Sequence, residues 1–197
     1  MYWFHPPRLN KYSDYAFYSP ENGGFSKHQC EKILSLWDGT TKNHAITGGS
    51  PESLLTHIPN DKRKSHIQWI HWSEEVDWIF AHLANLAMDC NSVRYRFQLN
   101  GFLEAIQMTE YKEGDHYDWH TDHGDGEFSV RKLSIVVQLS DPSNYEGGNL
   151  QVHGKKVECI DQGTVTFFPS FAAHKVHPVT KGTRYSLVAW LTGEPFR

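Results

Sequence analysis

The sequence has few cysteines and no long apolar run. Its 197 residues include three cysteines, Cys30, Cys90 and Cys159, and no two of them form a Cys-x-x-Cys pair. A sparse, odd number of cysteines is typical of a reducing compartment, and a chain of this length can bury roughly 70% of its unfolded surface without disulfides. No stretch approaches the roughly 18 apolar residues of a membrane span, and the first residues do not resemble a signal peptide. We therefore expect a cytoplasmic protein that does not act at a membrane.

Clustered positive charge is also scarce. The chain carries 19 lysines and arginines against 23 acidic residues, for a net charge of −4. The only tight basic run is "KRK" at 62–64, which we predict to be a solvated loop. This balance disfavours nucleic acid as a partner. The composition, 39% hydrophobic and 21% charged, is that of a globular protein, and the length favours one domain over residues 1–197.

Two amphipathic helices are predicted in the first half of the chain. In "FSKHQCEKILSLWDG", Ser26 and Gln29 have the spacing of a capping box, Gly39 is an expected stop, and the apolar stripe consists of Cys30, Ile33, Leu34 and Trp37. In "SEEVDWIFAHLANLAMDC", we expect Ser73 to cap the helix. The buried face of this second helix is predicted to consist of Val76, Ile79, Phe80, Leu83 and Ala87. Between the two helices, residues 39–65 are rich in turn-forming residues and predict a long loop.

From about residue 92 onward the pattern changes to period two. Short strands are predicted in "VRYRFQL", "LEAIQMTEY", "KLSIVVQLS", "NLQVHG", "VECI", "TVTFFPS", "HKVHPV" and "RYSLVAWLTG", which turn clusters separate. Helices followed by about eight strands predict a mainly β, α+β chain. Residues 1–91 would form helical and loop support for a two-sheet barrel or jelly roll over residues 92–197.

The segment "HYDWHTDHGD" at 116–125 raises the question of a metal site. Three overlapping His-x-Asp pairs occur in it: His116/Asp118, His120/Asp122 and His123/Asp125. Imidazole and carboxylate both suit divalent iron, manganese or zinc, and residues i and i+2 of a strand point to the same face. The first pair directly follows a Gly-Asp turn signal, and the last is interleaved with glycines. "YDWHTD" between them offers the best strand, so the middle pair is the predicted one.

A third ligand and a cation are expected from "FFPSFAAHKVHPVTKGTR". It contains His174 and His177, which strand alternation would place on opposite faces, so that only one is expected to point into the site. Arg184 follows in an apolar strand, where an unpaired guanidinium would be costly. Its partner would be either a protein carboxylate or an acidic cosubstrate, which arginine can grip with two parallel hydrogen bonds.

Less specialised roles are expected for several other residues. We predict that Gln107, Leu133 and Trp190 fill the barrel interior and that Cys159 is a buried apolar residue. His116 and His123 are expected to be solvated or to orient a ligand. For Tyr117, lining a substrate cleft and packing in the core remain equal alternatives.

These segments resemble the Fe(II)/2-oxoglutarate-dependent oxygenases, most of all their prolyl 4-hydroxylase and PKHD-type hydroxylase branch. "YKEGDHYDWHTD", "RKLSIVVQLSDPSNYEGGNLQV" and "GTVTFFPSFAAHKVHPVTKGTRYSLVAW" carry the resemblance, which covers about residues 97–192. It implies a double-stranded β-helix, or jelly-roll, core with N-terminal supporting helices. It also implies the following site: His120, Asp122 and His174 as iron ligands, Arg184 on the far carboxylate of 2-oxoglutarate, and Tyr111 lining the cosubstrate pocket.

The resemblance implies a dioxygenase that uses Fe(II), 2-oxoglutarate and O2, with ascorbate as a candidate reductant, and releases succinate and CO2. No protein acid or base is required, so no catalytic residue is expected beyond the metal centre. A prolyl residue of a protein or peptide is the expected substrate, and the 39–65 loop could close over it as a flap. A free amino acid or other small molecule is the alternative, as is a cupin-like metal-binding protein without oxygenase activity.

Overall fold

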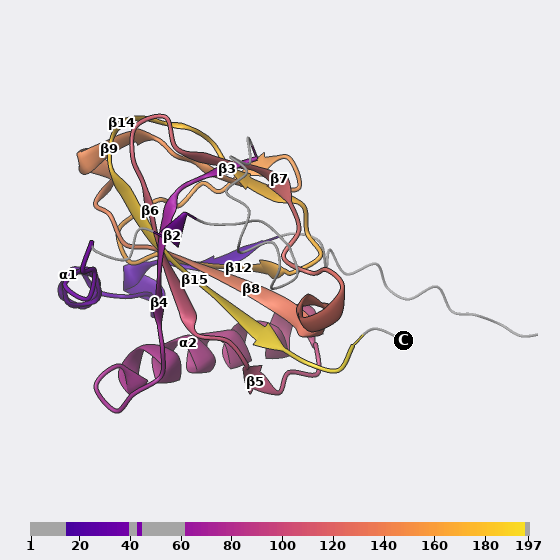
Figure 1. Ribbon diagram of the computed structural model, residues 1–197. Helices are drawn as coiled ribbons and strands as arrows, with labels where there is room; N and C mark the ends of the chain where they lie inside the picture. The colour runs from indigo at the N-terminus through magenta and orange to yellow at the C-terminus, as the bar shows by residue number, and fades with distance from the viewer. Residues whose placement is uncertain (1–14, 40–42, 45–61, 196–197) are drawn as a thin grey trace, which may run out of the picture.

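The protein folds as a sandwich of antiparallel sheets with helices against one face (Figure 1). The computed structural model describes residues 15–39, 43–44 and 62–195. Among these residues the helices are α1 (Lys27–Leu34) and α2 (Asp77–Cys90). The strands are β1 (Ala16–Tyr18), β2 (Asn43–His44), β3 (Arg63–Lys64), β4 (His66–Ile70), β5 (Gly101–Phe102), β6 (Ile106–Tyr111), β7 (His116–His120), β8 (Arg131–Gln138), β9 (Tyr145–Gly147), β10 (Leu150–Val152), β11 (Lys155–Lys156), β12 (Val165–Pro169), β13 (His174–Val176), β14 (Val179–Gly182) and β15 (Arg184–Thr192).

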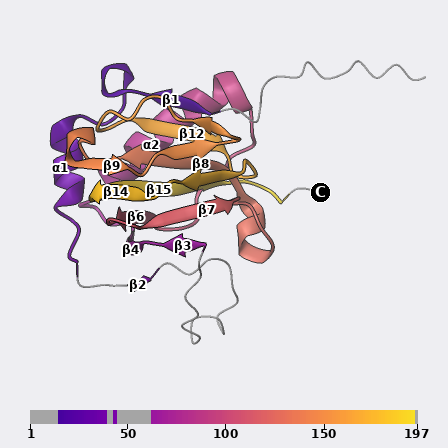
Figure 2. The same cartoon turned by 90° about the horizontal axis from the view of Figure 1, so that it is seen from above.

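The larger sheet has the order β1-β12-β8-β15-β6-β4-β2, with β5 added beside β15. Figure 2 shows these strands side by side from β1 to β2. The second sheet has the order β11-β10-β13-β7-β3, and β14 pairs separately with β9. In Figure 1, α2 lies on the side of the larger sheet that faces away from β3 and β7. This arrangement confirms the prediction of a mainly β, two-sheet core with helices outside.

The larger sheet buries both of its faces, and the alternation along β15 shows how. Leu187 and Leu191 belong to the cluster that the sheet forms with the helices. Arg184, Ser186 and Trp190 instead line a cavity between the sheets. Because successive side chains of a strand point to opposite faces, one strand supplies both the helix-side core and the cavity wall.

The predicted helices are present, but two of their ends are misplaced. The predicted stop at Gly39 is wrong, because α1 ends at Leu34 with Ser35 as its C-cap. Ser26 and Gln29 form the complete capping box that the sequence predicts at the start of α1. All five residues of the predicted apolar face of α2 are buried. The prediction that Ser73 caps α2 is wrong: the N-cap is Val76, whose N–H donates to the carbonyl of Ser73. Across the described residues, no helix is long and apolar enough to cross a membrane.

Two predicted strands are wrong. The first three residues of "VRYRFQL", 93–95, are the end of a π-helical turn, Asn91–Tyr95, that continues α2, and its other four residues form no strand. The side chain of Asn91 fixes this turn, because it donates to the carbonyl of Phe97 at 2.9 Å and accepts from the N–H of Phe97 at 2.8 Å. "VECI" also forms no strand. Within it, Cys159 is half-buried with its Sγ 3.2 Å from the hydroxyl of Thr164, so the prediction of a buried apolar residue is wrong.

The predicted loop at 39–65 contains strands where the structure describes it. β2 and β3 belong to the two different sheets, and the "KRK" run contributes β3 rather than a solvated loop. β4, which the sequence analysis missed, follows directly and pairs with β6. The rest of this segment lies outside the described residues, so the flap remains a prediction.

The N-terminal segment is packed against the β-core through a glycine. The N–H of Phe25 donates to the carbonyl of Gly163 at 2.8 Å, and Gly163 has a φ of +93°. A Cβ at this position would lie 1.8 Å from the carbonyl oxygen of Phe25, which is backbone and cannot move aside alone. The turn before β12 and the entry to α1 therefore fit together only with glycine here.

Gly163→Ala is expected to lower the free energy of unfolding by at least about 2 kcal/mol, since it adds a backbone clash to an unfavourable φ. Gly154→Ala is the matched control: its φ is +78°, but an added Cβ meets nothing within 4 Å. Gly154→Ala should lower the free energy of unfolding by only about 1 kcal/mol, because it adds the unfavourable left-handed conformation without a clash. Urea denaturation of both variants measures the difference, and equal losses would contradict the packing argument.

Candidate metal centre

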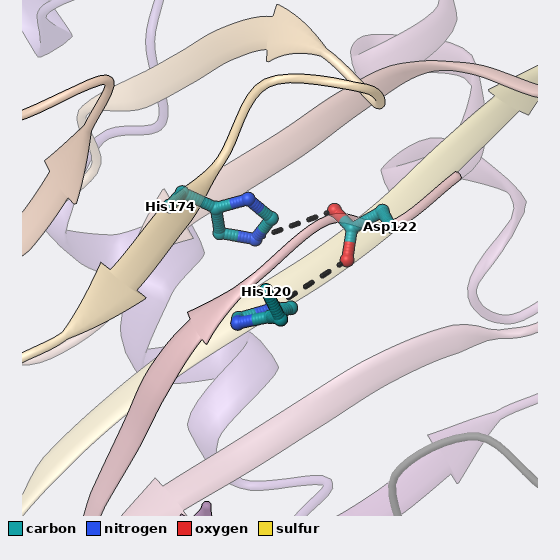
Figure 3. Close-up of side chains that lie close together, drawn as sticks. All are labelled: His120, Asp122 and His174. Carbon is teal, nitrogen blue, oxygen red and sulfur yellow. Dashed lines mark ion pairs between the residues drawn. The ribbon is translucent and has the colours of Figure 1, made fainter. Parts of the chain in front are cut away.

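Two histidines and one aspartate converge between the sheets. His120 ends β7 and His174 begins β13, and the two residues are direct partners in the antiparallel pairing of these strands. The potential ligand atoms of His120, Asp122 and His174 all lie within 4.8 Å of one another. The Nε2 atoms of the histidines lie 3.8 and 3.5 Å from the two carboxylate oxygens of Asp122 (Figure 3). The three side chains that the sequence singled out are therefore close enough to share one ion.

Backbone contacts orient both imidazole rings. Nδ1 of His120 lies 2.8 Å from the carbonyl of Asp118, and Nδ1 of His174 lies 2.9 Å from the carbonyl of Ala172. A carbonyl can only accept, so each Nδ1 carries the proton and each Nε2 is left as a lone-pair donor. Both lone pairs then face the carboxylate of Asp122, as a metal site requires.

Asp122 lies two residues beyond the end of β7, so its direction is not set by strand alternation. Its N–H donates to the carbonyl of Ser170 at 2.9 Å, and its Oδ2 accepts from the hydroxyl of Ser134 at 2.6 Å. The hydroxyls of Ser134 and Ser170 lie 3.0 Å apart, and both serines are fully buried. Asp122 is therefore not on one strand with His120 as predicted, although the two predicted residues do converge.

The electrostatics of the cluster favour the protonation states that bind metals. Burial and, next in size, the charge of nearby His174 together lower the pKa of His120 to about 3. Burial alone would raise the pKa of Asp122, but His174, His120 and the Ser134 hydroxyl outweigh it and lower the pKa of the carboxyl. A neutral His120 beside an ionised Asp122 is the pairing that a divalent cation needs.

The cluster lies in a cavity of about 840 Å³ between the two sheets. Its other walls include Arg63, Ile67, Trp69, Gln107, Tyr111, Tyr117, Phe128, Arg131, Val136, Leu150, Val176, Arg184, Val188 and Trp190. A volume of this size is ample for a small cosubstrate together with part of a second molecule. The wall is largely apolar, with a few charged groups placed at fixed points.

Arg184 is the charged group that most needs a partner. Its side chain is buried, and its Nε donates to the amide oxygen of Gln138 at 3.0 Å. Nη1 is buried without a hydrogen-bond partner, and no carboxylate of the described residues forms an ion pair with this guanidinium. The sequence leaves open whether a protein carboxylate or an acidic cosubstrate pairs with Arg184. The described part of the chain therefore favours the acidic cosubstrate.

Tyr111 lies directly beside this guanidinium. It faces Arg184 in the pairing of β6 with β15, and the guanidinium carbon lies 5.7 Å from the centre of its ring. Burial raises the pKa of Tyr111, which keeps its hydroxyl protonated. The predicted cosubstrate residues, Arg184 and Tyr111, thus line the same cavity as the histidine and aspartate cluster.

The other candidate residues divide between the cavity and the rest of the protein. Gln107 and Trp190 line the cavity rather than filling a core, whereas Leu133 is packed in the helix-side core as a fully buried residue. Tyr117 lines the cavity and also stacks on the ring of His120. His177 lies outside the cavity wall, where its Nε2 is 3.0 Å from the side-chain oxygen of Gln151.

His116 and His123 lie apart from the cluster. Nδ1 of His116 lies 3.4 Å from the carbonyl of Gly114. His123 lines the cavity but does not belong to the group of potential ligands.

Sequence reasoning missed Ser134, Ser170 and Arg63. Ser134 lies in β8 and Ser170 directly follows β12, and the sequence pattern of these segments indicates only buried strands. No signal in the sequence therefore connects the two serines to Asp122. Arg63 lies in a run that was interpreted as solvated, although the short "RKSHIQWI" stretch has the β-branched and aromatic residues of a strand.

Comparison with known proteins identifies relatives for about half of the chain. Residues 106–192 match the model of the 2OG-Fe(II) oxygenase superfamily. A PKHD-type hydroxylase of Synechococcus sp. (strain CC9902) is 34% identical over 98 residues, which are 48% of this chain and 44% of that protein. The chain spans about half the length of the curated relatives that it matches.

Solved structures match over nearly the whole chain. A prolyl-4-hydroxylase of Pseudomonas putida superposes with a TM-score of 0.66 at 19% identity, covering 91% of this chain and 92% of that one. A prolyl hydroxylase of Trichoplax adhaerens, solved with a hypoxia inducible factor peptide fragment, superposes with a TM-score of 0.69 at 17% identity, covering 94% and 86%. These matches confirm the predicted jelly-roll fold.

Ser134→Ala is expected to weaken Mn²⁺ binding by roughly tenfold, because hydrogen bonds to a metal-binding carboxylate typically contribute at least this much. Ser140→Ala is the matched control. Ser140 is a buried serine that accepts a hydrogen bond from the N–H of Tyr185 and does not contact Asp122. Titration followed by electron paramagnetic resonance measures the affinity, and an equal loss in both variants would show that Ser134 acts only through stability.

The metal-free protein should lose stability as the pH falls below 6.5. The folded pKa of His120 lies below the ordinary value of 6.5, so the unfolded chain binds the proton first and acid favours unfolding. Relative to His120→Gln, the loss should approach about 1.4 kcal/mol per pH unit between pH 6.5 and about 4.5. Chemical denaturation in the presence of a chelator tests this, and parallel pH profiles for the two proteins would contradict it.

Proposed function

Because residues 106–192 belong to the 2OG-Fe(II) oxygenase superfamily, we propose that this protein is a dioxygenase that oxidises 2-oxoglutarate to succinate and CO2 and hydroxylates an aliphatic C–H bond. The observation that carries the proposal is the buried guanidinium of Arg184. It has no carboxylate partner among the described residues and lines the same cavity as His120, Asp122 and His174. A dicarboxylic acid could pair one carboxylate with this guanidinium and reach with its other end toward His120, Asp122 and His174.

The residues present fit Fe(II) as the metal. Two imidazoles and one carboxylate form the ligand set of non-haem Fe(II) oxygenases, which hold the ion from one side and leave its other positions open. When bound, Fe(II) supplies the redox chemistry with O2 that the side chains themselves lack. The Nδ1 contacts of the two histidines and the hydroxyl of Ser134 hold the three ligand side chains in position before a metal binds.

The chain's own contribution is to bind, orient and exclude water. Arg184 would hold the far carboxylate of 2-oxoglutarate, and the protonated hydroxyl of Tyr111 is available to donate to the same molecule. Val136, Leu150 and Val188 line the cavity with apolar surface, which limits the access of water. No side chain is required to move a proton, so we assign no acid or base.

The substrate we propose is a prolyl residue in a protein or peptide. The names of the structural relatives support this choice, since both structures described above are prolyl hydroxylases and one is bound to a peptide. A free amino acid or another small molecule is the alternative, because a cavity of about 840 Å³ can hold one beside 2-oxoglutarate. Proline-containing peptides and free amino acids, compared by the mass gain of one oxygen atom, distinguish the two.

The first test is succinate formation by protein supplied with Fe(II), 2-oxoglutarate and ascorbate. Some turnover is expected even without substrate, and none should remain in His120→Ala or Asp122→Ala, which lose metal ligands. Folded, iron-loaded protein that never turns over 2-oxoglutarate would favour a cupin-like metal-binding protein instead.

Arg184→Ala should weaken 2-oxoglutarate binding by at least about tenfold, since it removes one partner of a buried charge pair. Binding is measured by calorimetry on Mn²⁺-loaded protein. Lys181→Ala, which removes an exposed cation paired with Glu146, serves as the control and should leave binding unchanged. Retention of wild-type affinity by Arg184→Ala would contradict the cosubstrate role.

A further inference from the structure

A second guanidinium, that of Arg63, lines the same cavity. Arg63 faces Tyr117 in the pairing of β3 with β7, and its guanidinium carbon lies 4.5 Å from the centre of the Tyr117 ring. Its Nε donates to the hydroxyl of buried Ser65 at 3.0 Å. The ring and the hydroxyl hold the guanidinium in one orientation and leave its two terminal nitrogens available for a ligand.

This guanidinium is close to the candidate metal centre. The ring of Tyr117 stacks on the ring of His120 with 3.4 Å between centres and an interplanar angle of 11°. Together with the 4.5 Å contact of Arg63, this stacking places the guanidinium carbon no more than about 8 Å from the His120 ring. A group bound at Arg63 would therefore belong to the part of a substrate near the reacting carbon.

Arg63, like Arg184 and unlike Arg131 and Lys64, forms no ion pair with a described carboxylate. Arg131, also on the cavity wall, makes a two-point ion pair with Glu104, and Lys64 pairs with Asp115 at 3.1 Å. The exposed Asp125 and Glu127 also line the cavity, but neither forms an ion pair with Arg63. The structure thus fixes a positive charge at this wall without neutralising it.

The charge of Arg63 acts on the interior of the cavity. Burial raises the pKa of Tyr111 and raises that of Tyr117 to about 12, and in both cases Arg63 is the strongest opposing influence. If the proposed function holds, the divalent metal, Asp122, the dianion 2-oxoglutarate and Arg184 together carry no net charge. Arg131 is paired with Glu104, and Asp125 and Glu127 are exposed, so Arg63 is then the half-buried cation of the described cavity wall that lacks a counter-charge.

We propose that Arg63 is a substrate-recognition residue that binds a carboxylate located close to the hydroxylated carbon. The inference rests on the proposed function and narrows its substrate class to acidic molecules. A guanidinium held by a ring face and a hydroxyl presents a planar pair of donors, which matches a carboxylate. Two sources supply this group: the α-carboxylate of a free or C-terminal amino acid, or the side chain of an acidic residue next to the target in a peptide.

Two pairs of probes distinguish these sources. N-acetylproline and N-acetylprolinamide differ in the α-carboxylate alone. The amidated dipeptides N-acetyl-Pro-Glu and N-acetyl-Pro-Gln differ in the side-chain carboxylate alone. Binding is measured by calorimetry on the protein loaded with Mn²⁺ and 2-oxoglutarate, and hydroxylation with Fe(II) is measured by the mass gain of one oxygen atom.

In the wild-type protein, at least one acidic probe should bind on the order of tenfold more tightly than its neutral partner, as expected for a charge-assisted pair. Arg63→Gln should abolish this preference, and Arg63→Lys should retain part of it. Lys64→Gln is the matched control: it removes the same charge from the next residue of β3, which does not line the cavity, and should keep the full preference.

Three results would overturn the inference: no acidic probe binding better than its neutral partner, a preference that persists in Arg63→Gln, or a preference lost equally in Lys64→Gln. Failure of the proposed function would look different. The proposed function assigns no contact between Arg63 and 2-oxoglutarate, so binding of 2-oxoglutarate and substrate-free succinate formation should be present in both wild type and Arg63→Gln. Their absence from both proteins would refute the oxygenase assignment itself.

Discussion

The antiparallel pairing of β7 with β13 is the constraint on which the candidate metal centre depends. It places His120 opposite His174, and each ring is then held through Nδ1 by a carbonyl two residues earlier in its own chain segment. The ladder alone does not place the third ligand. Asp122 is brought in by Ser170 and Ser134, which belong to the turn after β12 and to β8 of the larger sheet. The centre therefore joins the two sheets of the sandwich, and its geometry depends on how they are packed.

A second constraint is the distribution of positive charge around the cavity. The guanidinium groups of Arg63, Arg131 and Arg184 all lie on its wall, but only that of Arg131 is matched by a described carboxylate. Protein interiors rarely contain unmatched charge unless a ligand supplies the balance. Arg184 is buried, and the half-buried Arg63 is held by Ser65 and Tyr117, so both charges are preorganised for ligands.

Much of this arrangement could be predicted from the sequence because it depends on local rules. The capping box of α1, the buried face of α2 and most strands of the core follow from spacing alone. The residue pattern selected the pair at 120 and 122, whereas the choice of His174 over His177 followed from a resemblance to a family. The remaining features depend on contacts that residue spacing does not reveal: the Asn91 side chain that continues α2 as a π-helical turn, the Ser134 hydroxyl on Asp122, and the strands β1 and β4, which are ordered by pairing with β12 and β6.

The two-sided role of β15 has a consequence for how this protein tolerates errors. A shift of one residue in the pairing of this strand would turn Arg184 and Trp190 toward the helices and bring Leu187 and Leu191 into the cavity. Such a slip would bury a guanidinium in the apolar layer and remove it from the cavity in the same step. A misregistered molecule would therefore be unstable and would also lack the guanidinium in its cavity, so quality control that recognises only poor folding would also remove the molecules with an incomplete site.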